Sequence, residues 1–258
     1  MLPINSNLSK SIRVAQFSDC HLFQNKQGLH YGANVYENLH RVLCALSKLT
    51  HLDFVVFTGD LTQDHSEESY QNFAQLVREF NFNVPVYFVP GNHDERSDLT
   101  RFLSGKPFSS NKTATCGNWH FSFVDSKSET PAGYIASQEL ANAQKASDSE
   151  QYIFLFMHHH PIDVGYFIDR HGLENKEVFW KSMEQLVNLR GLACGHVHND
   201  MQLTKMINDN EISLFTCPAT SIQFAQHSHK VEASSTAPAF RLFEFNPDGS
   251  VLTNVQFL

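Results

Sequence analysis

The feature that most constrains the fold of this chain is a repeated pairing of an apolar segment with a polar cluster. Five short segments rich in Val, Ile, Leu and Phe each run directly into a group of Asp, Asn or His residues. Apolar runs of this length predict buried β-strands. The five predicted strands are 12–17, 54–57, 86–89, 152–157 and 191–194.

Helices are predicted between these strands. Apolar residues recur at helical spacing in several segments, and Ser66 is placed to cap one of them. Alternation of strands with helices is typical of the βαβ units of an α/β fold. The predicted helices are 35–49, 66–80, 138–146 and 174–189, and a further strand is expected at 119–124.

The C-terminal third has a different pattern. Strand-like segments flank turn residues twice, at 208–210 and at 247–249. Such patterns predict hairpins, so this part of the chain is expected to be antiparallel. Residues 226–238, rich in Ser and Ala, are expected to form a long loop that walls or covers a substrate pocket.

The polar clusters are expected to meet in one place, because ligands of open α/β sheets bind outside the carboxyl ends of the strands. Residues i and i+2 of an extended segment point the same way, so Asp19 and His21 can share one ion while Cys20 faces elsewhere, and the same spacing relates His196 and His198. The donors are nitrogen and oxygen without thiolate, which suits Mn, Fe, Zn or Co. The clusters are Asp19-Cys20-His21, Gly59-Asp60, Gly91-Asn92-His93-Asp94, His158 and Gly195-His196-Val197-His198.

Composition limits the partners. A formal net charge of -8 disfavours long nucleic acids, although bound metal ions can still attract a small phosphoester. No stretch approaches the roughly 20 apolar residues of a spanning helix, so no membrane partner is expected. The five cysteines are scattered and odd in number. They indicate neither a disulfide framework nor a thiolate zinc site, and they favour a cytoplasmic location.

In this order, the motifs D-x-H, G-D, G-N-H-D, H and G-H-x-H resemble the signature of the calcineurin-like metallophosphoesterases. Longer stretches are similar to the bacterial class III cyclic nucleotide phosphodiesterases. They are 18–23, 32–34, 158–161, 218–224 and 237–241. The similarity departs at Cys20, where that family commonly has Thr or another small residue, and this places a thiol beside the site.

The resemblance implies a four-layer αββα sandwich, with two mixed β-sheets flanked by helices. It also implies a single domain of residues 1–258, in which about residues 1–11 form a flexible extension. The implied cofactors are two divalent or trivalent metal ions, with Fe and Mn first and Zn, Co or Mg as alternatives. Monomer and homodimer both stay open.

The resemblance also assigns roles to residues. Asp19, His21 and His198 hold one metal. Asn92, His158 and His196 hold the other, and Asp60 bridges both. His158 is preferred because it directly follows an apolar strand, and His159 is the alternative if the register shifts by one. His93 is expected to face the phosphate and to help the leaving oxygen, with Asp94 orienting its ring. The expected substrate-binding residues are Asn92, His93 and His198.

The implied reaction is hydrolysis of a phosphodiester by a hydroxide that bridges the two metals. The first choice of substrate is 3′,5′-cyclic AMP, converted to 5′-AMP. The alternative is another metallophosphoesterase that acts on glycerophosphodiesters, 2′,3′-cyclic nucleotides or phosphomonoesters. A non-catalytic scaffold is the last choice, because no ligand position is lost. The other histidines, including His30 and His65, are expected to have ordinary surface or core roles.

Overall fold

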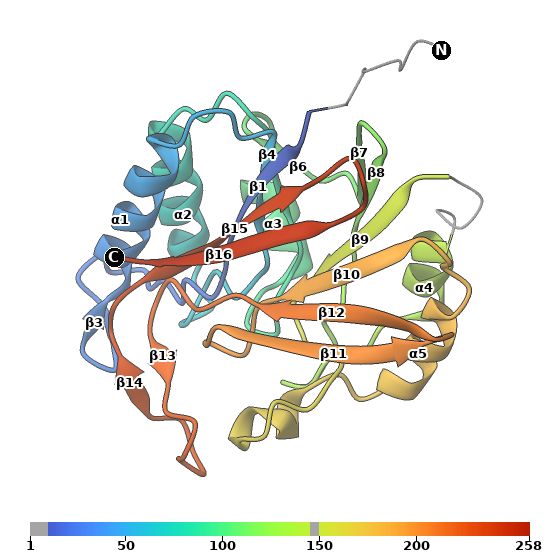
Figure 1. Ribbon diagram of the computed structural model, residues 1–258. Coiled ribbons are helices and arrows are strands. Elements are labelled where there is room, and N and C mark those ends of the chain that lie inside the picture. The colour runs from blue at the N-terminus through green and yellow to red at the C-terminus, as the bar shows by residue number, and fades with distance from the viewer. Residues whose placement is uncertain (1–9, 145–149) are drawn as a thin grey trace.

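Two six-stranded sheets lie face to face in the computed structural model, which describes residues 10–144 and 150–258 (Figure 1). The neighbours from β1 to β6 in the first sheet are parallel, and two antiparallel C-terminal strands extend it. In spatial order this sheet consists of β16 (Val251–Phe257), β15 (Ala239–Phe245), β1 (Ile12–Phe17), β4 (Phe54–Phe57), β5 (Val86–Phe88) and β6 (Phe108–Ser109).

The second sheet is also mixed. Its four central strands are parallel and both edge strands are antiparallel. In spatial order it consists of β11 (Met201–Ile207), β12 (Asn210–Thr216), β10 (Leu189–Cys194), β9 (Tyr152–Met157), β8 (Trp119–Phe123) and β7 (Thr113–Cys116).

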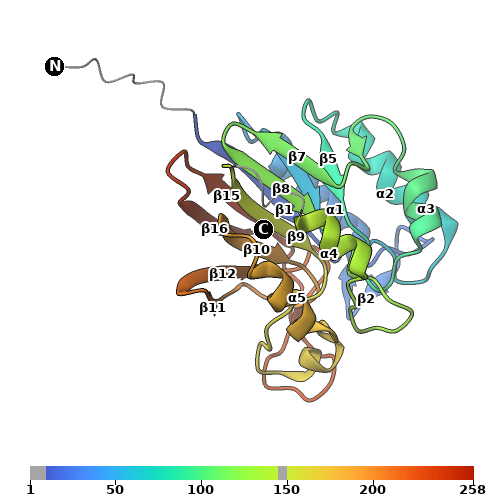
Figure 2. The same cartoon turned by 90° about the vertical axis from the view of Figure 1, so that its right-hand side faces the viewer.

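Helices cover the outer face of each sheet (Figure 2). The first sheet carries α1 (Val35–Ser47), α2 (Glu67–Glu79) and α3 (Arg96–Phe102), and the second carries α4 (Ser137–Gln144) and α5 (Lys176–Met183). In the described part of the chain, three smaller elements lie outside the two large sheets and the five helices. They are the hairpin β2–β3 (Leu29–His30 and Ala33–Asn34), the 3₁₀ helix η2 (Phe167–His171) and the hairpin β13–β14 (Gln223–Phe224 and Ala233–Ser235).

The period of two along each strand explains the four layers. In β4, Phe54 and Val56 belong to the core between the sheets, whereas Val55 and Phe57 pack toward the helices. β9 follows the same rule, with Phe154 and Phe156 between the sheets. That central core is rich in aromatic rings, which bury roughly 150–250 Å² each. Both sheets are therefore apolar on both faces, as the αββα arrangement requires.

The structure confirms the predicted α/β alternation and the four-layer sandwich. The strands predicted at 12–17, 54–57 and 152–157 have those bounds. The Ser66 side chain caps α2 by accepting a hydrogen bond from the Ser69 amide at 3.3 Å. Most of the predicted N-terminal extension, residues 1–9, and the end of the helix predicted at 138–146 lie outside the described residues.

Three expectations were wrong in part. The helix predicted at 174–189 ends at Met183, because the chain turns and then enters β10 at Leu189. The C-terminal third is not wholly antiparallel, because β12 pairs in parallel with β10. Part of the loop predicted at 226–238 is the strand β14, which pairs with β13.

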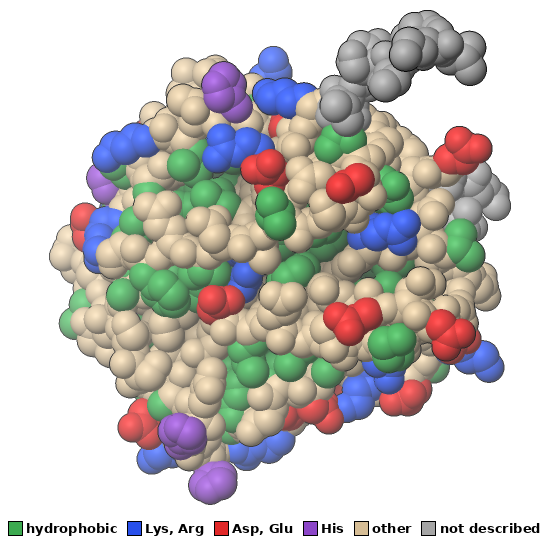
Figure 3. All heavy atoms as spheres, in the orientation of Figure 1, with side chains coloured by type: hydrophobic (Ala, Val, Ile, Leu, Met, Phe, Trp, Pro, Cys, Tyr) green, Lys and Arg blue, Asp and Glu red, His purple; other side chains and the backbone are tan. Residues whose placement is uncertain are grey.

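The face of the molecule in Figure 3 carries acidic and basic side chains interspersed, without a large region of one sign. Among the described residues, no helix combines the length and apolar character that crossing a bilayer requires.

Candidate metal centre

The ends of β1, β4, β9 and β10 bring the predicted ligands together. Asp19 and His21 follow β1 and Asp60 follows β4, while His158 follows β9 and His196 follows β10. Backbone hydrogen bonds join the first two segments, because the amides of Asp19 and His21 donate to the carbonyls of Gly59 and Asp60. The sheets thus deliver side chains from distant parts of the sequence to one buried spot, as strand-end convergence predicts.

The first ligand group is formed by Asp19, His21 and His198, whose ligand atoms lie within 4.8 Å of one another. The Nε2 atoms of His21 and His198 are 3.2 Å apart, and His198 Nε2 lies 3.3 Å from an Asp19 carboxylate oxygen. The Asp19 carboxylate also accepts a hydrogen bond from the His196 amide. Asp19 therefore fixes the loop that carries the other ligands.

The second group is formed by Asn92, His158 and His196. His158 Nε2 lies 3.2 Å from Asn92 Oδ1 and 3.1 Å from His196 Nδ1. Asp60 lies between the groups, with its Oδ2 3.4 Å from His158 Nε2 and 3.7 Å from His21 Nε2. This position is the one that the bridging assignment requires.

The rings of His158 and His159 face different neighbours. His158 Nε2 faces the Asn92 and Asp60 oxygens. The His159 ring instead lies against Ser126, with Nδ1 2.8 Å from the hydroxyl, and its Nε2 is 3.3 Å from the carbonyl of Pro131. His159 does belong to a compact group with His158 and His196, but its own nitrogens are already occupied.

In His158 and His198, a hydrogen bond made by Nδ1 leaves Nε2 as the nitrogen that can bind a metal ion. His158 Nδ1 lies 2.6 Å from the Thr58 carbonyl, and His198 Nδ1 lies 2.8 Å from the Ile222 carbonyl. Carbonyl oxygens only accept, so each Nδ1 carries a proton and each ring turns its Nε2 toward a carboxylate. Buried carboxylates need a positive charge beside them, which a bound cation or a protonated ring supplies.

Burial and neighbouring groups shift the pKa values of two of these histidines in opposite directions. Burial lowers the pKa of His158, but the Asp60 carboxylate raises it, and the result is a pKa of about 9. For His196, burial lowers the pKa well below its usual value, and the neighbouring His159 and His158 add to the effect. Two buried nitrogens, His21 Nδ1 and His196 Nε2, have no partner among the described residues. The donor set fits a pair of metal ions, which would replace the proton on His158.

Five of the predicted ligands have left-handed backbone conformations. Their φ angles are +57° for Asp19, +49° for His21, +57° for Asp60, +66° for His196 and +52° for His198. Such conformations cost of order 1–3 kcal/mol each for residues other than glycine, and they gather at functional sites where the surroundings enforce them. The strained backbone at these five residues is therefore retained because it directs their side chains into the site.

Close backbone approach also requires glycine at this site. A Cβ on Gly91 would lie 2.2 Å from Asp60 Oδ1, and one on Gly195 would lie 2.1 Å from the Ser18 hydroxyl. Larger residues at either position would push the metal-binding loops apart.

His93 and Asp94 do not interact as expected. The Asp94 carboxylate accepts hydrogen bonds from the amides of Asp60, Leu61 and Gly91, at 2.8 to 2.9 Å. His93 Nδ1 has no hydrogen-bond partner among the described residues, so Asp94 does not orient the ring. Burial and then Asp60 raise the pKa of Asp94 to about 7, while its backbone donors oppose the shift. Asp94 is a residue that holds the Asp60 loop in place.

His93 nevertheless borders the metal centre. Its backbone amide donates to Asp60 Oδ1 at 2.9 Å, and its ring meets the His21 ring edge-on at 4.9 Å between centroids. The other side of the ring stacks with His65 at 5.7 Å. His65, which was expected to have an ordinary surface or core role, therefore helps to fix the ring that Asp94 was expected to fix.

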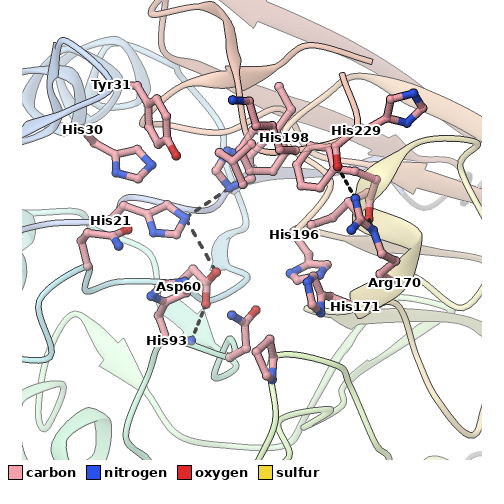
Figure 4. A pocket seen from close by; sticks show the side chains of 18 of the residues that line it. His21, His30, Tyr31, Asp60, His93, Arg170, His171, His196, His198 and His229 are labelled. Carbon is pink, nitrogen blue, oxygen red and sulfur yellow. Dashed lines mark hydrogen bonds and ion pairs between the residues drawn. The ribbon is translucent and has the colours of Figure 1, made fainter. Parts of the chain in front are cut away.

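A cavity of about 720 Å³ opens over the metal centre (Figure 4). The β2–β3 hairpin forms one wall, and η2 together with the 229–231 segment forms the other. The predicted wall at 226–238 is thus present, and the Arg170 side chain donates a hydrogen bond to the carbonyl of His229. Sequence reasoning did not single out His30, Tyr31 or Arg170. Only the resemblance of the adjacent 32–34 stretch pointed to the first wall.

The model of the family described as "Calcineurin-like phosphoesterase" matches residues 12–200. This range spans every one of the predicted ligands and most of the chain. The chain belongs to the calcineurin-like phosphoesterase family. Its site is therefore one for metal-dependent cleavage of phosphoesters, and the recognised motif positions coincide with the residues that the structure brings together.

Similar members of the calcineurin-like phosphoesterase family carry more specific names. A "Probable cyclic nucleotide phosphodiesterase" of Colwellia psychrerythraea strain 34H is 47% identical, with 97% of this chain and 96% of that protein covered. The "3′,5′-cyclic adenosine monophosphate phosphodiesterase CpdA" of Escherichia coli strain K12 is 31% identical, with 96% and 90% covered.

A solved structure agrees on architecture. The dimetal phosphatase from Danio rerio superposes with a TM-score of 0.63 at 15% identity, covering 95% of this chain and 99% of that one. At this identity the match shows the shared fold.

Proposed function

We propose that this protein hydrolyses 3′,5′-cyclic AMP to 5′-AMP. The observation that carries the proposal is the pair of ligand groups that share Asp60, with His93 beside them at the floor of one open cavity. The names of relatives that match nearly the whole chain support a cyclic nucleotide as the substrate. A cavity of about 720 Å³ lies within the range of roughly 300–1,000 Å³ that is usual for small-molecule sites.

Two metal ions are proposed as cofactors, with Fe and Mn as the first choices. Asp19, His21 and His198 would hold one of them, and Asn92, His158 and His196 the other. When bound, the pair supplies an activated water and neutralises charge on the phosphoryl oxygens. The mixed nitrogen and oxygen donors support this choice of metals, since no thiolate takes part.

His93 is proposed as the general acid. Conversion to 5′-AMP breaks the bond between phosphorus and the 3′ oxygen, while a water oxygen joins phosphorus. The departing 3′ oxygen needs a proton, and His93 is placed to donate one. The edge-on contact with His21 and the stack on His65 hold its ring at the cavity. General acid catalysis of this kind contributes about 10²–10⁴-fold.

Asn92, His93 and His198 are proposed to contact the phosphate of the substrate, because all three line the cavity beside the metal centre. Asp94 is proposed to act indirectly, by accepting a hydrogen bond from the Asp60 amide and so holding the backbone of Asp60. A cytoplasmic location is proposed because all five cysteines are free thiols, as is usual in a reducing compartment.

A substrate panel tests the proposal. Protein loaded with Mn²⁺ would be assayed with cyclic AMP, cyclic GMP, 2′,3′-cyclic nucleotides, bis(p-nitrophenyl) phosphate and a glycerophosphodiester. We expect turnover of cyclic AMP, with 5′-AMP as the only nucleotide product. Turnover of another diester with no action on cyclic AMP would overturn the substrate assignment and leave the metal-dependent chemistry in place.

A further inference from the structure

The tip of the β2–β3 hairpin has a residue that its turn does not favour. Leu29 pairs with Asn34 and His30 pairs with Ala33, so the two-residue turn consists of Tyr31 and Gly32. Their φ angles are +47° and +88°. Positive φ at both central residues is the mark of a type I′ turn, for which Asn-Gly is the preferred sequence. Glycine fits the second position, but tyrosine at the first is strained.

Packing does not explain why tyrosine stands there. Tyr31 is 54% exposed, and its hydroxyl has no hydrogen-bond partner among the described residues. Its one aromatic neighbour is His30, whose ring it meets edge-on at 4.9 Å. A strained conformation whose energetic cost is not offset by packing contacts points to a functional role.

The hairpin holds Tyr31 at the mouth of the cavity over the metal centre. The His30 ring stacks on the metal ligand His21, with 5.1 Å between centroids and 3° between planes. Asn34, the last residue of the hairpin, caps α1 by accepting a hydrogen bond from the Glu37 amide. The tip is therefore anchored on both sides. Figure 4 shows the hydroxyl end of Tyr31 directed into the cavity between His21 and His198.

The Tyr31 ring contacts His30, and it is His30 that stacks on the predicted ligand His21, so Tyr31 stands one ring farther from the metal centre. This separation decides which part of a substrate it meets. The phosphate must lie at the metal centre, and in a cyclic nucleotide the base is the part that extends farthest from it. A purine has an aromatic face, and stacking on an aromatic side chain is a sequence-tolerant way to bind it. We propose that Tyr31 is a specificity residue that stacks with the base of the cyclic nucleotide. This inference rests on the proposed function.

A substitution at the turn tests the proposal, because it should make the protein more stable and its binding of cyclic AMP weaker. Tyr31→Asn creates the favoured Asn-Gly turn, so it should raise Tm by roughly 2–4 °C. It removes the ring, so it should raise KM for cyclic AMP about tenfold, with kcat within about threefold. Tyr31→Phe keeps the ring and should keep the wild-type KM. A residue with a merely structural role would not combine higher stability with weaker binding.

A matched control separates strain from binding. His51 is an exposed residue with φ of +65°, and it precedes β4 at the end of the strand opposite the ligands. His51→Asn relieves similar strain and should raise Tm without a change in KM.

Inhibition by two phosphates then locates the contact. In the cyclic AMP assay, 5′-AMP and ribose 5-phosphate both present a phosphate to the metals, but only the first carries a base. Tyr31→Asn should raise the inhibition constant of 5′-AMP about tenfold and leave that of ribose 5-phosphate unchanged. Equal shifts for both inhibitors, or an unchanged KM, would overturn the role of Tyr31 while cyclic AMP turnover by the wild type upholds the proposed function. No turnover of cyclic AMP by the wild type would overturn both.

Discussion

The ring of His198 lies parallel to the ring of Phe224, with 3.9 Å between centroids and 4° between planes. The same imidazole has its Nδ1 2.8 Å from the carbonyl of Ile222. The segment leading into β13 thus fixes both the tilt and the tautomer of a proposed metal ligand. Contacts of this kind behind a ligand control metal affinity as well as ligand orientation.

Phe224→Leu should weaken metal binding although Phe224 has no ligand atom. The ring that supports His198 is lost, so the imidazole can rotate away from Asp19. We expect the affinity for Mn²⁺ to fall about 10–100-fold, as it does when contacts behind a metal ligand are removed. Calorimetric titration of chelator-treated protein measures this. Phe167→Leu is the control, because Phe167 contacts Phe224 at 5.1 Å but no ligand ring. Equal affinity in the two variants would argue against the stack.

Adjacent histidines provide a matched pair for the choice of ligand. His158→Ala should lose metal from the group that includes Asn92 and His196, because its Nε2 faces their ligand atoms. His159→Ala should retain both ions, since its ring is engaged by Ser126. Elemental analysis after gel filtration gives the metal content per chain. Metal loss from the His159 variant alone would reverse the assignment.

His93→Ala should keep its metals and lose most of its turnover. The interaction that ties His93 to Asp60 uses the backbone amide, which the substitution preserves. If the ring is the general acid, kcat for cyclic AMP should fall about 10²–10⁴-fold. Substrates with a p-nitrophenolate leaving group need no proton, so their turnover should fall much less. A similar loss for both kinds of substrate would contradict the role as an acid.

Asp60→Ala should lose both ions. Its carboxylate lies between the two groups and faces His158 and His21, so no other described side chain can take its place. Asp94→Ala is an informative companion, because it removes a carboxylate that contacts only backbone amides at this loop. We expect that variant to be less stable yet still able to bind metal. Full metal occupancy in the Asp60 variant would refute its bridging position.

The pKa of His30 predicts a pH effect on stability. Burial, followed by the nearby His198 and His93, lowers this pKa from 6.5 to about 4. Between these pH values the unfolded chain binds more protons than the native protein, so stability falls as the pH falls. His30→Asn removes this contribution and should lose less stability than the wild type from pH 6.5 to pH 4. Urea unfolding of chelator-treated proteins at several pH values tests it. Parallel curves would show that His30 does not titrate as inferred.

Local sequence was enough to predict the elements whose residues have one way to be buried. Phe54–Phe57 is apolar on both faces, and only a central strand between two layers uses all four side chains. The convergence of the candidate ligands could be predicted for a related reason, because each follows such a strand. What the motifs could not supply is the partner of each side chain. Asp94 was expected to contact the His93 ring, but backbone amides compete for its carboxylate and hold it.

Elements that depend on distant contacts were missed or misplaced. The helix predicted to reach residue 189 ends at Met183. Leu186 and Leu189 keep the helical spacing that suggested a longer helix. They are instead buried from the connection after the helix and from β10. η2 has no periodicity to detect. It is held by Asp169, whose carboxylate lies 3.1 Å from His160 Nε2 and accepts hydrogen bonds from nearby amides. The η2 part of the cavity wall was therefore beyond local reasoning, although the cavity floor and the 229–231 segment were not.

Each ligand group draws on both sheets. In the first group, Asp19 and His21 follow a strand of one sheet, and His198 follows a strand of the other. In the second group, Asn92 follows a strand of the first sheet, whereas His158 and His196 follow strands of the second. Neither half of the chain can therefore assemble a complete site. Metal capture would report the moment at which the two halves of a refolding chain dock correctly, and a metal-sensitive signal could time that step without an added probe.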